Sequence, residues 1–166
     1  MVRKQNMGLQ LPWRPDMGNQ TTTGNIAAIR IRGEIGISHD VEDALKHIHL
    51  THKNYCVVKP GSPEFLGVLR KIKDRVTFGE IEDETYELLY KKRGEPYRGI
   101  TKDAKEKISY SRKWIEIDGK KLKPVFRLNN PKGGFERKGI KTGYGAGGVL
   151  GYRGKAINDL IKRMIH

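Results

Sequence analysis

The sequence predicts an α+β fold in which a ferredoxin-like β-α-β-α-β core, a small sheet with helices packed on one face, carries a basic glycine-rich C-terminal extension. Runs of strand length, apolar or alternating, occur at residues 26–33, 55–60 and 76–81. Amphipathic segments that begin with capping residues lie between these runs. Such an alternation of strands and helices is typical of this fold class.

Positive charge is concentrated after this core. The 166 residues carry a net charge of +14. Residues 24–94 hold twelve basic and eleven acidic side chains, whereas residues 95–166 hold eighteen basic and seven acidic ones. This excess indicates a polyanionic partner. We therefore divide the chain into an N-terminal extension (1–25), a core domain (26–94) and a basic C-terminal extension (95–166).

The first strand, IAAIRIRG (26–33), alternates apolar and basic side chains. Ile29 and Ile31 fall on one face of the strand, and Arg30 and Arg32 fall on the other. The pattern predicts a strand with one buried face, whose arginines either face solvent or contact phosphate.

Each of the three core helices has a recognisable start. Ser38, Ser62 and Asp83 occupy capping positions, and Pro63 suits the first helical position because its missing N–H is not needed there. Gly94 is expected to end the third helix in the left-handed conformation. Apolar residues at helical spacing predict the buried stripes of the first two helices: Val41, Leu45 and Ile48, then Phe65, Leu69 and Ile72.

The C-terminal extension has fewer regular patterns. Residues 95–113 are highly charged and favour at most a weak helix. Asp118-Gly119 predicts a hairpin within residues 114–128 because this dipeptide lies between two alternating stretches. Residues 129–154 form a glycine-rich loop, and KAINDLIKRMI (155–165) has the spacing of a final amphipathic helix.

Several function classes have no support in the sequence. No run approaches 18 apolar residues and no signal-peptide pattern is present, so we expect no membrane association. The single cysteine, Cys56, excludes an intramolecular disulfide and suits core packing in a reducing cytosol. His47, His49 and His52 diverge near a helix end and form no metal set. We expect no catalytic residues, no metal and no cofactor.

The hexapeptide GYGAGG (143–148) matches the dinucleotide-binding pattern G-x-G-x-x-G. That site needs a strand directly before the glycines, a helix directly after them and an acidic residue about twenty positions further on. Here the preceding strand-like run ends at Leu128, the following helix begins near Lys155, and the chain ends too soon for the acidic residue. The context therefore disfavours a cofactor site, and a nucleotide-dependent enzyme that uses GYGAGG stays open only as a minor alternative.

RNA binding explains the glycine-rich loop better, although a simple solvated loop stays open as the alternative. Residues 129–155 contain nine glycines, six basic residues and one acidic residue. Glycines let a backbone approach phosphates, cations neutralise them, and aromatic rings stack on unpaired bases. The predicted RNA contacts in the extension are Arg127, Lys132, Gly133, Gly134, Arg137, Lys138, Lys141, Tyr144, Arg153 and Lys155. Those in the core are Arg30, Arg32, Arg70, Lys71 and Lys73, where the helix dipole explains part of the basic run.

Four segments follow one another as in a known family: IRIRGEIGISHDVEDALKHIHLTHKNYCVV, GSPEFLGVLRKIKDRVTFGEI, KPVFRLNNPKGGF and GGVLGYRGKAINDLI. Together they resemble the archaeal form of the large-subunit ribosomal protein family numbered thirty in bacteria and seven in eukaryotes. The chain departs from the family pattern at Asn129 and Asn130, where His and Pro are usual, and in its longer N-terminal extension.

The resemblance implies a core packed against ribosomal RNA and a cytoplasmic, non-catalytic role in the structure and assembly of the large subunit. It implies three partners: large-subunit ribosomal RNA, the small ribosomal RNA of the central protuberance, and neighbouring ribosomal proteins. It also implies that Arg127 and the turn Pro131-Lys132-Gly133-Gly134 belong to an RNA-binding arm. The alternative hypothesis is a non-ribosomal RNA-binding module or RNA chaperone on a similar core.

Overall fold

The computed structural model describes residues 24–100, 114–117 and 119–166. The predicted N-terminal extension, apart from its last two residues, and most of the segment for which a weak helix was considered lie outside these residues. The first half alternates strands and helices: β1 (Asn25–Arg30), α1 (His39–His47), β2 (Tyr55–Pro60), α2 (Pro63–Lys71), β3 (Val76–Glu80) and α3 (Asp83–Arg93). The second half consists of β4 (Ile115–Ile117), β5 (Lys120–Leu122), β6 (Phe126–Arg127), β7 (Gly151–Tyr152) and α4 (Ile157–Met164), with 3-10 turns η2 (Gly139–Lys141), η3 (Tyr144–Ala146) and η4 (Gly154–Ala156).

The predicted α+β class is confirmed, and β1 lies at the centre of the sheet. The strand order is β6-β2-β1-β3-β7, with β2 and β3 both antiparallel to β1 and β7 parallel to β3. Both edge strands come from the C-terminal extension, so residues beyond the predicted core domain complete the sheet. The predicted hairpin is present as a separate two-stranded sheet in which Ile117 pairs with Lys120.

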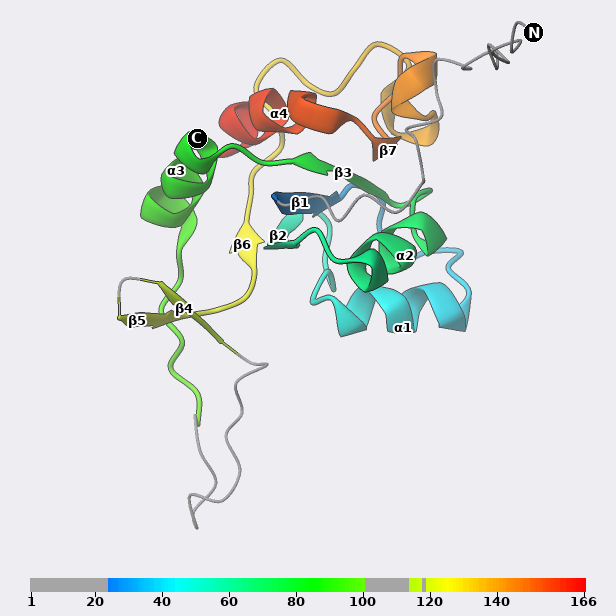
Figure 1. Cartoon of the computed structure of the whole chain (residues 1–166). Coiled ribbons are helices and arrows are strands. Elements are labelled where there is room, and N and C mark those ends of the chain that lie inside the picture. The colour runs from blue at the N-terminus through cyan, green and yellow to red at the C-terminus, as the bar shows by residue number, and fades with distance from the viewer. Residues whose placement is uncertain (1–23, 101–113, 118) are drawn as a thin grey trace, which may run out of the picture.

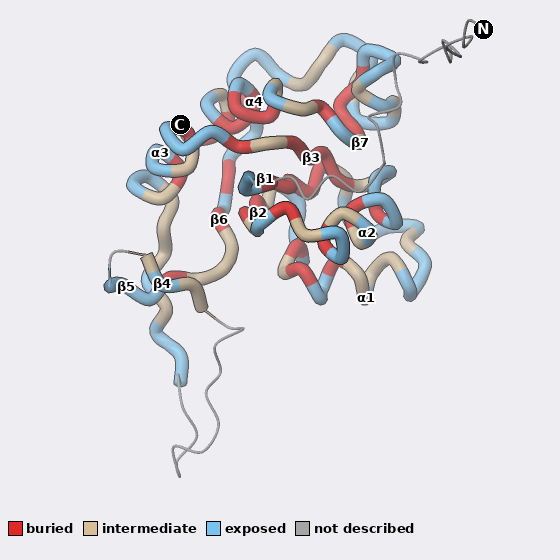
Figure 2. The backbone as a smooth tube through the Cα atoms, in the orientation of Figure 1, coloured by how far each residue is buried: buried red, intermediate tan, exposed pale blue. Residues whose placement is uncertain are grey.

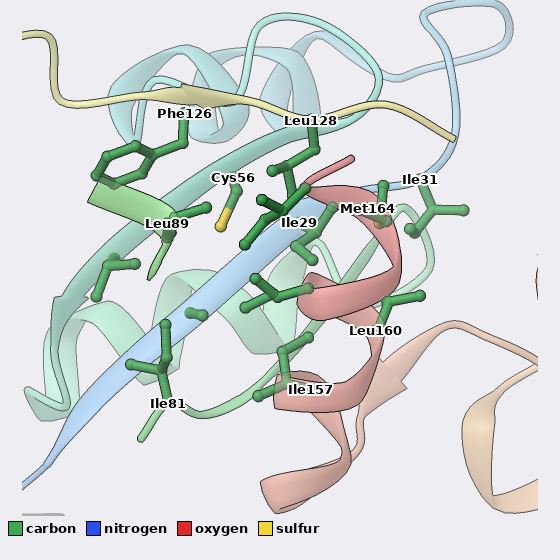
Figure 3. Packing of buried hydrophobic residues seen from close by; sticks show 14 of the residues in the cluster. Ile29, Ile31, Cys56, Ile81, Leu89, Phe126, Leu128, Ile157, Leu160 and Met164 are labelled. Carbon is green, nitrogen blue, oxygen red and sulfur yellow. The ribbon is translucent and has the colours of Figure 1, made fainter. Parts of the chain in front are cut away.

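The two helices of the β-α-β-α-β core, α1 and α2, cover one face of the sheet as predicted, and later elements cover the other face (Figure 1). Helices α1 and α2 pack on one face against Ile26, Ala28 and Val57. The opposite face is covered by α4, whose apolar side chains pack against Ile29 and Cys56 (Figure 3). Figure 2 shows the result, with buried backbone running through the sheet and exposed segments around it. The sheet is therefore the middle layer of three.

Local sequence explains the helix boundaries. The Ser62 hydroxyl accepts a hydrogen bond from the Phe65 N–H at 3.2 Å, and Pro63 opens α2 as predicted. Helix α3 begins after Glu82 rather than after Asp83. Gly94 follows α3 with φ −66° and ψ 112°, so it does not adopt the expected left-handed conformation. Glycine is needed there for space, because a Cβ atom would lie 2.5 Å from the carbonyl oxygen of Tyr90.

Candidate nucleic-acid interface

Strand pairing brings the two predicted groups of cations to one end of the sheet. A short connection leads from the end of α2 to the start of β3, so it lies at the end of the sheet where β3 begins. The glycine-rich loop leads into β7, and Gly151 of β7 pairs with Thr77 near the start of β3. The β1–α1 connection lies at the same end because β1 is antiparallel to β3. We call this region the basic end; its predicted contacts are Arg32, Arg70, Lys71, Lys73, Arg137, Lys138 and Lys141.

Most cations of the basic end are exposed and have no internal partner among the described residues. Six are exposed, and within the described part of the chain their side chains have no hydrogen bond or ion pair: Arg70, Lys71, Lys73, Arg137, Lys138 and Lys141. Arg32 is half-buried and donates to the carbonyl oxygen of Asp74 at 3.3 Å. A cation that folding leaves unpaired is available for a phosphate.

Arg153 is buried instead of exposed. Its side chain is 1% exposed, and Nη1 lies 2.9 Å from the Glu136 carboxylate. Nε donates to the Thr77 hydroxyl at 2.9 Å and Nη2 to the carbonyl oxygen of Val149 at 3.2 Å, while the guanidinium lies 4.6 Å from the Tyr144 ring centre. The predicted contacts Arg153 and Tyr144 therefore hold the glycine-rich loop against β3, and we leave Arg153 out of the RNA-binding set.

Arg30 is likewise engaged inside the fold, with 2% of its surface exposed. Its Nε donates to the carbonyl oxygen of Arg32, and Nη1 donates to the carbonyl oxygens of Leu50 and Thr51. Burial lowers its pKa, with smaller influences from Glu34 and other neighbouring charges. The expected solvated face of β1 is wrong because α1 and the loop after it cover that face. We leave Arg30 out of the set as well.

The remaining predicted contacts lie outside this group of cations: Arg127 lies at the same end of the sheet but on its opposite edge, β6, and Lys132 lies on the arm that follows β6. Arg127 is exposed on β6, 3.4 Å from the Glu95 carboxylate and 5.8 Å from the Tyr55 ring centre. Lys132 is exposed at the turn that the Gly134 N–H closes by donating to the Pro131 carbonyl oxygen at 3.0 Å. The two glycines of this turn have φ near +77°, a conformation that other residues rarely adopt. Lys155 is exposed beyond β7, toward the far end of β3.

The GYGAGG glycines are used mainly by the loop itself. The N–H groups of residues 144, 146, 147 and 148 all donate to carbonyl oxygens within residues 143–150. Gly147 has φ +87°, and a Cβ atom on Gly148 would collide with the carbonyl of Thr142. Gly145, in contrast, has open space around its Cα. These amides are therefore not free for phosphates, and the segment supports the neighbouring cations.

Sequence reasoning missed the residues that hold the loop in place. Glu136, the single acidic residue of the loop, accepts hydrogen bonds from Arg153 and, at 3.4 Å, from Arg163 of α4. Burial alone would raise the pKa of Glu136, but the hydrogen bond from Arg153 and the nearby guanidinium charges outweigh it and lower the pKa. Asn158 ties α4 to the end of β3, since its side chain bonds the Glu82 N–H and the Glu80 carbonyl oxygen. Only the fold brings these residues together.

The described residues give little support for other kinds of functional site. Within residues 24–100, 114–117 and 119–166, no group of three His, Cys, Asp or Glu side chains could hold a metal ion. Over the same ranges, no helix combines the length and the apolar character that crossing a membrane requires. Cys56 is fully buried, and burial raises the pKa of its thiol to about 12.

Comparisons with known proteins show which proteins the chain is similar to. Residues 26–76 match the family described as ribosomal protein L30p/L7e. The chain is similar to large ribosomal subunit protein uL30 of Methanopyrus kandleri, with 46% identity over 149 residues that cover 81% of this chain and 100% of the relative. The uL30 proteins of Nanoarchaeum equitans and Methanococcus maripaludis are 40% and 37% identical, each over 84% of this chain and at least 97% of the relative.

Proposed function

The chain belongs to the uL30 family of large ribosomal subunit proteins, and from this membership we propose that it is a structural constituent of the large subunit that binds ribosomal RNA through its basic end. Members of this family are structural components, so we assign the chain no catalytic role. As part of the ribosome it works in the cytoplasm.

The observation that carries the proposed binding surface is the set of exposed cations that the fold leaves unpaired. The α2–β3 connection contributes Arg70, Lys71 and Lys73, and the glycine-rich loop contributes further cations beside them. Each cation that meets a phosphate displaces condensed counterions, so RNA binding weakens steeply as the salt concentration rises. Lys132 and Arg127 extend the proposed surface along the arm.

The internal bonds of the loop support this role. Arg153 and Glu136 fix the loop to β3 and α4 before any RNA is present. The conformational entropy of ordering the loop is then lost during folding rather than during binding, which favours affinity. The buried arginine thus positions the exposed cations without touching RNA.

The proposed partners follow from the family. Ribosomal RNA and neighbouring ribosomal proteins surround a subunit component of this kind. We further propose that the small ribosomal RNA of the central protuberance lies within reach of the chain; the resemblance of the arm segments KPVFRL and PKGG to the family supports this finer placement.

Sedimentation of the full-length protein with large subunits tests the function. We expect stoichiometric migration with the large subunit at moderate salt. A variant with Lys71→Gln and Lys73→Gln is expected to dissociate at lower salt, whereas Lys92→Gln on α3 serves as the control. A protein that binds RNA but stays at the top of the gradient would contradict the proposal and favour a non-ribosomal RNA-binding module.

A further inference from the structure

A groove of about 580 Å³ lies on another part of the surface, between β2, the end of α1, α3 and the hairpin. The hairpin and the 3-10 turns of the basic end lie on opposite sides of the molecule in Figure 1. The volume of the groove falls within the range that small-molecule pockets occupy. The charged or titratable nitrogen groups on its wall belong to Lys59, His47 and His49, and none of the described lining residues is Asp or Glu. The groove therefore favours an anionic ligand.

Trp114 gives the groove an aromatic wall. Its indole Nε1 is buried and has no hydrogen-bond partner among the described residues. The Lys121 ammonium lies 4.7 Å from the centre of the Trp114 ring system and adds positive charge beside it. Tyr86 supplies a second aromatic wall.

Lys59 gives the same groove a partly desolvated cation. Burial lowers the pKa of its ammonium, and no carboxylate among the described residues lies within ion-pair distance of it. Its Nζ lies 5.7 Å from the ring centre of Phe65. A cation held in this way without an internal counterion favours an anion brought by a ligand.

We propose that this groove binds one unpaired nucleotide of ribosomal RNA, with its base stacked on Trp114 and its phosphate at Lys59. Flat aromatic rings beside cations are the features by which proteins hold unstacked bases. A peptide backbone would not supply the anion that the Lys59 ammonium favours. The inference rests on the proposed function, since it adds a second RNA contact to the basic end.

Tryptophan fluorescence of the full-length protein tests the inference directly. Trp13→Phe leaves Trp114 as the single tryptophan, so the emission reports the groove itself. The probes are a single-stranded adenylate hexanucleotide and a double-stranded RNA of the same length. We expect saturable quenching with the single strand alone. Trp114→Ala, followed by filter binding, should weaken single-strand affinity about 5- to 150-fold, the range for base–aromatic stacking.

Lys59→Gln keeps the test independent of hairpin stability, because it leaves Trp114 in place. We expect the affinity for the single strand, measured from the quenching titration, to fall about tenfold. This is the low end of the effect of a hydrogen bond to a charged group. Lys92→Gln should change nothing. Full RNA binding by filter assay without quenching, or equal quenching by the duplex, would overturn the inference and leave the proposed function standing. Absence of all RNA binding would overturn both.

Discussion

Replacing Arg153 by Ala tests whether this arginine has a structural role that differs from the role proposed for the exposed cations around it, which is RNA binding. In the folded chain this side chain links β3 to the glycine-rich loop through Thr77, Glu136 and Val149. Because the guanidinium is buried, the substitution should lower the free energy of unfolding and act on RNA affinity only through the loss of loop structure.

The magnitude follows from the contacts. Removing one partner of a buried ion pair costs about 3–5 kcal/mol, because the other charge remains unpaired. The Glu136 side chain keeps 23% exposure, and Arg163 Nη2 stays 3.4 Å from the same oxygen, so its charge is only partly stranded. We therefore expect a loss near the lower limit, about 3 kcal/mol. In a domain of this size that corresponds to about 6–12 °C in Tm.

Urea unfolding followed by circular dichroism measures this loss, and filter binding measures the RNA affinity. Lys138→Ala is the matched control from the same loop, since Lys138 is exposed. It should change the free energy of unfolding by less than about 0.5 kcal/mol while weakening RNA binding. If Arg153→Ala loses less than about 1 kcal/mol of stability yet binds RNA poorly, Arg153 contacts RNA and the structural assignment is wrong.

Three further predictions concern the loop and the core. Gly148→Ala should cost about 1–3 kcal/mol because its Cβ atom collides with backbone, whereas Gly145→Ala has room and should be tolerated; thermal melts compare them. The lowered pKa of Glu136 means that its contribution to stability is present above its unfolded pKa of about 4.3 and is lost as the pH falls through the lower folded value. Urea titrations from pH 6 to pH 3 should therefore show a flatter acid limb for Glu136→Gln, and identical limbs would refute this. The Cys56 thiol, with its pKa raised to about 12 by burial, should resist an aromatic disulfide reagent until the chain unfolds; rapid labelling of the native protein would contradict its placement.

Local patterns predicted the elements that depend on neighbouring residues. The Ser62-Pro63 start of α2, the apolar strand at 55–60 and the Asp118-Gly119 hairpin signal all act within a few positions, and the structure contains each element. The amphipathic character of the last helix was predicted as well, and the structure fully buries its apolar side chains Ile157, Leu160, Ile161 and Met164.

The partners of these elements could not be predicted in the same way. The sequence shows that α4 has an apolar face, but not that this face covers the second side of the sheet. Arg30 belongs to an alternating strand and Arg153 to a basic glycine-rich segment, so local patterns predicted both as surface cations. Long-range packing buries both instead. Charge content therefore indicated the region proposed to bind RNA, while the fold determines which of its cations are exposed.

The salt dependence of RNA affinity tests the central claim most directly. The full-length protein and the variant with Arg137→Gln, Lys138→Gln and Lys141→Gln are titrated with large-subunit ribosomal RNA at several salt concentrations. Each lost phosphate contact lowers the slope of log affinity against log salt by about 0.7–0.9. We predict a slope shallower by about two to three units in the variant, with unchanged unfolding. Parallel lines would show that these cations do not meet RNA and would contradict the proposed basic end.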